Sequence, residues 1–205
     1  GQAISSFASQ RGAITKISFS SDGSMIAAGS STNASVIIWQ TRTGQLVNSF
    51  ERPPHYLVGM AFRPKSESVL ISTTPLAWIL DAKSGTLMQS FILGSCCGRV
   101  VEFSPDGQTI AFSNQLWDVE NRKLLRELDT NLSSLSFSPD GTKMVSVHSS
   151  QPTFVSGRGY ISPPSEVKIW NVQTGQILNK IQGGTPNNIQ GLAFNPNNKN
   201  ILIAE

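Results

Sequence analysis

One sequence pattern, repeated along the whole chain, constrains the fold more than any other feature. A short apolar segment ends in phenylalanine and is followed by a turn sequence, most completely Phe-Ser-Pro-Asp-Gly. The copies end at Phe19, Phe62, Phe103, Phe137 and Phe194. Their spacings of 43, 41, 34 and 57 residues scatter around the roughly 40 to 45 residues of a small four-stranded β-module. The repetition therefore predicts an array of similar modules.

A second motif lies between these copies. It is a bulky residue with a glycine or arginine five positions later, followed by an apolar tail: Trp39 and Gly44, Leu80 and Gly85, Trp117 and Arg122, Trp170 and Gly175. The two motifs together predict four short antiparallel strands per period, joined by tight turns. No helical periodicity is long enough to compete. At the third copy, Arg122 replaces the turn glycine and predicts a locally altered turn.

A single four-stranded sheet of this kind cannot bury both of its faces. Neighbouring sheets must therefore stack, and large side chains must fill the space between them. Each phenylalanine or tryptophan can bury roughly 150 to 250 Å². The repeated aromatic residues are accordingly predicted to form the core between sheets, and we do not assign them to a cofactor.

The two motifs together resemble those of the WD-repeat β-propeller family over nearly the whole chain. The resemblance implies an all-β fold, a β-propeller of four-stranded antiparallel blades. We expect four full blades at about residues 13–50, 57–91, 99–128 and 132–181, a partial fifth blade at about 189–205, and a leading outer strand near 3–7. The aspartate of the family's Trp-Asp pair is present as Asp118 and as Asp81 after Leu80, but it is replaced in Trp39-Gln40 and Trp170-Asn171, and the family's Gly-His is missing. The resemblance thus implies blades held by packing, without the family's buried His–Asp network.

The blade count raises a question of completeness. Family propellers commonly close with seven blades, which would need close to 300 residues at about 42 per blade. An open end would expose unpaired strand edges. We therefore expect the sequence to be part of a longer propeller, its remaining blades supplied by further sequence or by a partner chain.

Composition narrows the remaining possibilities. The 205 residues include 16 Lys and Arg and 13 Asp and Glu, a net charge of +3 without a basic run. Nucleic-acid binding is therefore disfavoured. No apolar stretch reaches the roughly 18 to 20 residues of a membrane span. The two cysteines, Cys96 and Cys97, form no disulfide framework. They favour an intracellular setting, the cytoplasm with the nucleus as an alternative.

No catalytic, cofactor-binding or metal-binding residues are predicted. Only two histidines occur, His55 and His148. Gly94-Ser95-Cys96-Cys97-Gly98 has the outline of a nucleophile elbow, but the helix which that motif requires does not follow. Gly157-Arg158-Gly159 lacks the third glycine of a dinucleotide loop. Adjacent cysteines are awkward zinc ligands. The chain is therefore predicted not to be an enzyme.

In such a fold the loops are expected to determine binding specificity, because the side chains of the strands are used in packing between sheets. The 57-residue spacing contains an insertion at about residues 148–165, and a second loop joins the first two blades. Arginine and aromatic residues in such loops favour protein contacts. We predict a partner-binding set of Arg52, His55, Tyr56, Arg99, His148, Phe154, Arg158 and Tyr160. The insertion could equally be decorative.

The sequence therefore predicts a non-enzymatic protein–protein interaction scaffold, the sensor or docking region of a larger regulatory protein. Its partners are proteins of unspecified identity, and no membrane is involved. Two alternatives stay open. One is the propeller part of a hydrolase whose catalytic domain lies elsewhere, and the other is a nucleic-acid-associated WD-repeat protein.

Overall fold

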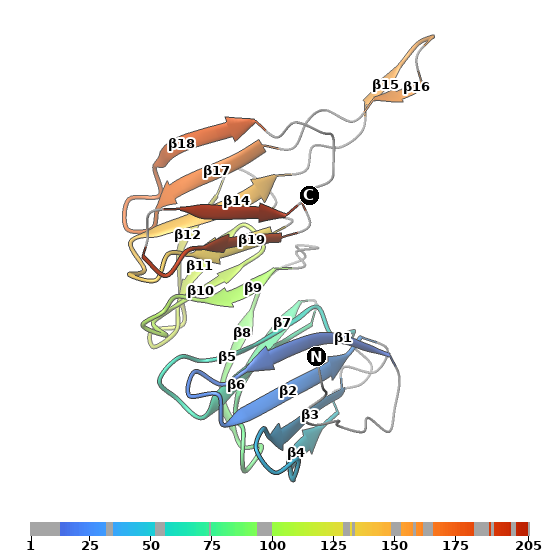
Figure 1. The fold of residues 1–205 in the computed structure, drawn as a ribbon, viewed down its shortest axis with the longest axis vertical. Helices are drawn as coiled ribbons and strands as arrows, with labels where there is room; N and C mark the ends of the chain where they lie inside the picture. The colour runs from blue at the N-terminus through green and yellow to red at the C-terminus, as the bar shows by residue number, and fades with distance from the viewer. Residues whose placement is uncertain are drawn as a thin grey trace. The chain divides into compact units, whose positions relative to one another are not determined.

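A computed structural model gives the fold (Figure 1). It describes residues 13–31, 35–51, 56–73, 75–93, 100–128, 132, 134–148, 153–157, 159–161, 166–182, 189, 191–197 and 200–204. Within these residues the chain forms β-strands and no helix. Two compact units divide the chain, Gly1–Cys97 and Gly98–Glu205.

The first unit contains two four-stranded antiparallel sheets, blue to green in Figure 1. Both sheets are ordered as the chain runs, so neighbouring strands are joined by short hairpins. The first sheet is β1 (Ile14–Phe19), β2 (Met25–Ser30), β3 (Ser35–Gln40) and β4 (Leu46–Phe50). The second is β5 (Gly59–Phe62), β6 (Ser68–Ser72), β7 (Leu76–Asp81) and β8 (Leu87–Ile92).

The second unit contains two further four-stranded sheets and two of two strands. The third blade is β9 (Val101–Phe103), β10 (Thr109–Phe112), β11 (Gln115–Asp118) and β12 (Lys123–Glu127). The fourth is β13 (Ser134–Phe137), β14 (Lys143–His148), β17 (Glu166–Asn171) and β18 (Ile177–Gln182). A hairpin of β15 (Thr153–Val155) and β16 (Gly159–Ile161) lies between β14 and β17, and β19 (Gly191–Phe194) pairs with β20 (Ile201–Ala204).

This architecture confirms the predicted all-β propeller of four full blades and the start of a fifth. The predicted leading strand near residues 3–7 lies outside the described residues.

The turn after each phenylalanine follows from its side chains. In the third blade, Gly107 N–H donates to the Ser104 carbonyl at 2.8 Å, and Gly107 takes a positive φ of 73°. The Asp106 carboxylate accepts the Gln108 N–H at 3.0 Å, and Ser104 Oγ accepts the Thr109 N–H at 2.9 Å. The first and fourth blades repeat these bonds, and there hydrogen bonds from serine hydroxyls hold the pKa of Asp22 and of Asp140 at about 2.

The turn to the outer strand has a left-handed residue at the same place in all four blades. Gly44, Gly85 and Gly175 have φ values of 70°, 72° and 68°, and Arg122 has 52° in the equivalent place. Asn121 N–H donates to Asp118 Oδ1 at 2.8 Å, as Ser84 N–H donates to Asp81 Oδ1 at 2.7 Å. Arg122 therefore keeps the left-handed φ of the turn glycines, and the third blade differs in pairing Asp118 with Lys123 across the turn. The side-chain bonds hold the turn, and Arg122 accepts the strain of a left-handed backbone.

The core lies between successive sheets, because each strand presents alternate residues to either face. In the first unit, Val36 and Ile38 of the first blade pack with Phe62 and Ile71 of the second. In the second unit, Leu116 and Leu128 pack with Phe137 and Trp170, and Val145, Val147 and Val167 pack with Leu192 and Phe194. The repeated phenylalanine therefore packs on the blade before it in these three pairs.

One phenylalanine departs from the predicted inter-blade core. Phe62, Phe103 and Phe137 are 6%, 5% and 5% exposed, but Phe19 is 56% exposed. Its sheet face is opposite the one that packs on the second blade, and among the described residues no sheet of the first unit covers it. The prediction of a buried Phe19 is therefore wrong. Burial depends on a neighbouring sheet that covers the ring, and the motif itself does not supply that sheet.

Candidate partner-binding site

The connection between the second and third strands distinguishes the fourth blade from the others. It occupies residues 31–34, 73–75 and 113–114 in the first three blades, but 149–165 in the fourth. There the chain forms the hairpin β15–β16 (Figure 1), a structure that the sequence analysis expected only as a loop. Gly157, with a φ of 82°, supplies the left-handed residue that its turn requires.

The hairpin brings two of the predicted residues together. Phe154 on β15 and Tyr160 on β16 are direct cross-strand partners. Phe154 is 64% exposed, which is unusual for a ring of this size. Paired aromatic positions on a hairpin present apolar area with little side-chain entropy to lose on binding. This pair is the strongest candidate contact in the predicted set.

A polar cluster of the fourth blade includes the first residue of β17, which follows the insertion in sequence. His148, the last residue of β14, pairs with Glu166, the first of β17. The Glu166 carboxylate lies 3.5 Å from Lys168 Nζ and 3.5 Å from Lys180 Nζ. Lys168 is only 4% exposed and lies 5.7 Å from the centre of the Trp170 ring. The cluster thus neutralises a buried lysine of β17.

The Trp170 indole adds a second anchor. Its Nε1–H donates to Ser146 Oγ on β14 at 2.8 Å, and the bond is buried. It ties the central strands of the fourth blade together from the side chains as well as the backbone.

The remaining predicted residues are not brought to this site by the described structure. Tyr56 belongs to the first unit, where it is 71% exposed ahead of β5. Arg52, His55, Arg99 and Arg158 lie outside the described residues. Their place in a partner-binding surface stays a prediction.

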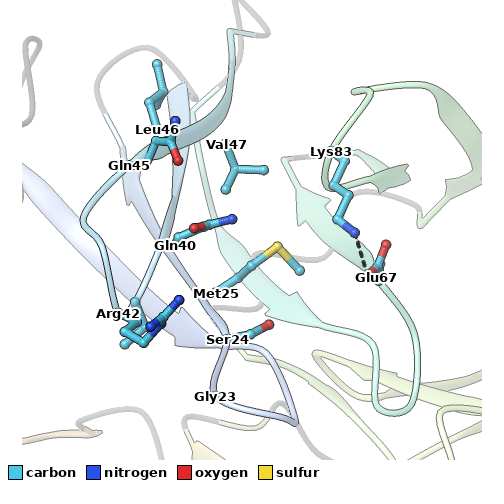
Figure 2. A pocket seen from close by; sticks show the side chains of 11 residues that line it. Gly23, Ser24, Met25, Gln40, Arg42, Gln45, Leu46, Val47, Glu67 and Lys83 are labelled. Atoms are coloured by element: carbon cyan, nitrogen blue, oxygen red, sulfur yellow. Dashed lines mark hydrogen bonds and ion pairs between the residues drawn. The ribbon is translucent and has the colours of Figure 1, made fainter.

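Sequence reasoning missed a groove in the first unit. It is a cavity of about 880 Å³ formed by turns and strands of both blades, lined by Gly23, Ser24, Met25, Gln40, Thr41, Arg42, Gln45, Leu46, Val47, Glu67 and Lys83. Figure 2 shows Arg42 on one side and the Lys83–Glu67 ion pair, 2.7 Å long, on the other. Hydrogen bonding to Glu67 raises the pKa of Lys83. The sequence analysis did not predict the groove, because its residues come from repeat turns and strands that are separated along the chain.

Two chemical possibilities were tested against the described part of the chain. It contains no group of three or more His, Cys, Asp or Glu side chains able to hold a metal ion. Among the same residues, no helix has the length and hydrophobicity to cross a membrane.

The fold and repeats define a β-propeller built of four-stranded blades. Residues 1–40 match the family model described as WD domain, G-beta repeat. Among solved structures, a chain of hydrazine synthase from Kuenenia stuttgartiensis is similar, with a TM-score of 0.79 and 16% sequence identity. The match covers 99% of this chain and 58% of that one, and at this identity it shows the fold alone. The family model thus covers the first 40 of the 205 residues, and the structural likeness supports the propeller fold. No curated protein matches the sequence.

Proposed function

We propose that the chain is a non-enzymatic interaction scaffold that binds a protein partner through the β15–β16 hairpin. One observation supports this most directly, the hairpin itself: among the described residues of the four blades, only the fourth blade carries extra strands in this connection, and Phe154 is 64% exposed on it. WD40 repeats generally mediate protein–protein interactions.

The mechanism would be recognition by shape and aromatic contact, without chemical change of the partner. An intracellular setting stays a prediction, because it depends on cysteine usage and both cysteines lie outside the described residues.

The test is quantitative proximity labelling with the chain as bait, comparing Phe154→Ser with wild type. Its matched control is Ile92→Ser on β8, which removes an apolar side chain that is 75% exposed in another blade. We expect Phe154→Ser to remove specific partners, because interface aromatic residues commonly contribute about 2 kcal/mol or more. Ile92→Ser should retain them. Equal partner recovery with both variants would count against the hairpin as the recognition element.

A further inference from the structure

The groove in the first unit is lined by three consecutive residues of the first blade, Gln40, Thr41 and Arg42. They follow Trp39, the bulky residue of the second repeat motif, and each of the other blades has residues at the same three places. Those blades show which residue types the turn itself requires. Gln40 and Thr41 both depart from that pattern, and a departure that the turn does not need points to a role in binding.

The first departure is Gln40. In the other three blades this place holds Asp81, Asp118 and Asn171, and the side-chain oxygen of each accepts the backbone N–H three residues later, at 2.7, 2.8 and 2.8 Å. Gln40 is longer, and its Oε1 accepts the Thr43 hydroxyl at 3.0 Å instead. No residue in the described part of the chain accepts from its Nε2. Figure 2 shows the Gln40 side chain extending into the groove, where its amide can donate to a ligand.

The second departure is Thr41. Its equivalents in the other blades are apolar: Ala82, Val119 and Val172. Ala82 and Val119 are fully buried, and Val172 packs against the core of the second unit. The Thr41 hydroxyl oxygen is also buried, yet it has no hydrogen-bond partner among the described residues. A buried hydroxyl without a partner destabilises the fold, so packing of the turn does not account for this threonine.

Arg42 gives the groove a positive charge that the described residues do not neutralise. Arg42 is exposed, and no described residue forms an ion pair or hydrogen bond with it. Across the groove, Lys83 is paired with Glu67 at 2.7 Å (Figure 2). A smaller hollow of about 300 Å³ shares Glu67 and adds one charge of each sign, Lys65 and Asp22. The lining therefore has an excess of one positive charge, which favours an anionic ligand.

The groove also has apolar surface between its charged sides. Met25 is 5% exposed and belongs to the core of the first unit, and Val47 packs against that core. Figure 2 shows both side chains between Arg42 and the Lys83–Glu67 pair. The cavity volume of about 880 Å³ is in the range of sites for small organic molecules, roughly 300 to 1,000 Å³. The groove can therefore hold an apolar group and a charged group of one ligand together.

We propose that this groove binds an apolar monocarboxylate, either as a free acid or as the last residue of a peptide. The Arg42 guanidinium holds the carboxylate, because its paired N–H donors match the two carboxylate oxygens. Gln40 Nε2 donates to the same group, and Met25 and Val47 contact the apolar part. One negative charge on the ligand balances the excess positive charge of the lining. The site lies in the first unit and shares no residue with the β15–β16 hairpin, so the two proposals can fail separately.

The test is an NMR titration of the 205-residue protein with N-acetyl-leucine, followed by the Gln40 side-chain amide and Met25 methyl signals. N-acetyl-leucinamide keeps the apolar part but has no charge, so it is the matched ligand control. We expect saturable shifts with the acid. The amide should bind more weakly by about tenfold or more, the effect of losing a charged hydrogen bond.

A second arm identifies the source of the carboxylate. The tripeptide N-acetyl-alanyl-alanyl-leucine has the same last residue and a free carboxyl end. Tighter binding than that of N-acetyl-leucine would assign the groove to peptide ends, because the peptide fills more of the groove. Equal binding would assign it to the free acid, and either result supports the proposal.

Three variants locate the binding. Arg42→Gln removes the charge and should weaken N-acetyl-leucine binding about tenfold. Gln40→Asn introduces the residue of the fourth blade, which suits the turn but is shorter, and should weaken binding about threefold. Arg122→Gln is the matched control. It removes an arginine charge from the equivalent turn of the third blade and should leave the affinity unchanged, and thermal unfolding checks that each variant is folded.

Two results would overturn the proposal. One is equal binding of the acid and the amide, or no saturable shift with the acid. The other is equal affinity of wild type and Arg42→Gln, or an equal loss in Arg42→Gln and Arg122→Gln, because the overall charge of the protein would then attract the acid.

Discussion

Phe19 and Phe62 hold the same place in the repeat, yet their side chains differ in solvent exposure. Both end the innermost strand of a blade and precede a tight turn, but Phe19 is 56% exposed and Phe62 is 6% exposed. Phe62 packs on the first blade. Phe19 faces away from the second blade and has no described sheet in its unit to cover it. The motif thus sets strand and turn, whereas the preceding sheet sets burial.

The residue before the repeated phenylalanine also differs between blades. This residue accepts a hydrogen bond from the next blade in two of the junctions. Phe62 N–H donates to Ser18 Oγ at 3.3 Å, and Phe137 N–H donates to Glu102 Oε1 at 3.1 Å. A small hydroxyl serves one junction and a carboxylate serves the other. The backbone geometry repeats, but its electrostatic consequences do not.

The largest expected change in the free energy of unfolding comes from replacing each of the two phenylalanines with alanine. Phe62→Ala should lower the free energy of unfolding by about 3–5 kcal/mol, because it leaves a cavity in a packed core. Phe19→Ala should cost less than about 1 kcal/mol, since an exposed ring has little contact to lose. Urea denaturation followed by tryptophan fluorescence measures both. Equal losses would show that Phe19 is covered in solution.

The junction at Glu102 predicts a pH dependence that the Ser18 junction lacks. Burial raises the pKa of Glu102 to about 7 from 4.5, although hydrogen bonds from Phe137 N–H and the Ser136 hydroxyl act in the opposite direction. The folded chain therefore binds this proton more tightly than the unfolded chain does. Its contribution to stability is complete below pH 4.5, is lost as the pH rises to about 7, and is constant above that.

The total change across this window is at most about 3 kcal/mol. Glu102→Gln keeps an acceptor for Phe137 N–H and should remove the dependence, as seen by denaturation at several pH values. A Ser18→Ala variant is the control and should retain the wild-type pH profile. A Glu102→Gln variant with an unchanged profile would assign the titration to another group.

The two-residue loop between β10 and β11 of the third blade contains a residue whose replacement should raise the stability by a smaller amount. Ser113 has a φ of 53°, is 1% exposed, and its hydroxyl has no hydrogen-bond partner in the described structure. Ser113→Gly removes both the left-handed backbone strain and the unpaired buried hydroxyl. It should raise the free energy of unfolding by about 1–2 kcal/mol. Ser113→Ala removes the hydroxyl alone and should recover part of this gain. Thermal unfolding of the two variants separates the contributions.

The smallest effect comes from exchanging residues at the outer turn. Arg122→Gly should stabilise the chain by about 1 kcal/mol, because glycine adopts the left-handed backbone without strain. The opposite kind of change at the equivalent position of the second blade, Gly85→Ala, should destabilise the chain. Its φ is 72°, and a Cβ there would lie 3.1 Å from the Phe50 ring. Chemical denaturation measures both. A destabilised Arg122→Gly would mean that the arginine side chain makes a contact worth more than the strain.

Much of the fold could be predicted, because each blade is specified by local signals. The Ser-Pro-Asp-Gly turns form as their side chains suggest, and the bulky residue before each outer turn lies on a strand. The paired strands β15 and β16 were missed, because a short segment such as Thr153–Val155 carries no clear alternation. Of the predicted partner-binding residues, the described structure brings together only Phe154 and Tyr160, by cross-strand pairing. The groove was not foreseeable, because it joins turns far apart in sequence.

The sequence by itself determined the four-stranded repeat, its turns and the family resemblance, because these depend on backbone preferences and on alternation within a few residues. Only the tertiary structure decided which equivalent residues are buried and where the Asn48 amide finds its acceptor, the Lys83 carbonyl of the next blade. Those outcomes depend on the neighbouring sheet, and a repeat motif does not state which neighbour it will have.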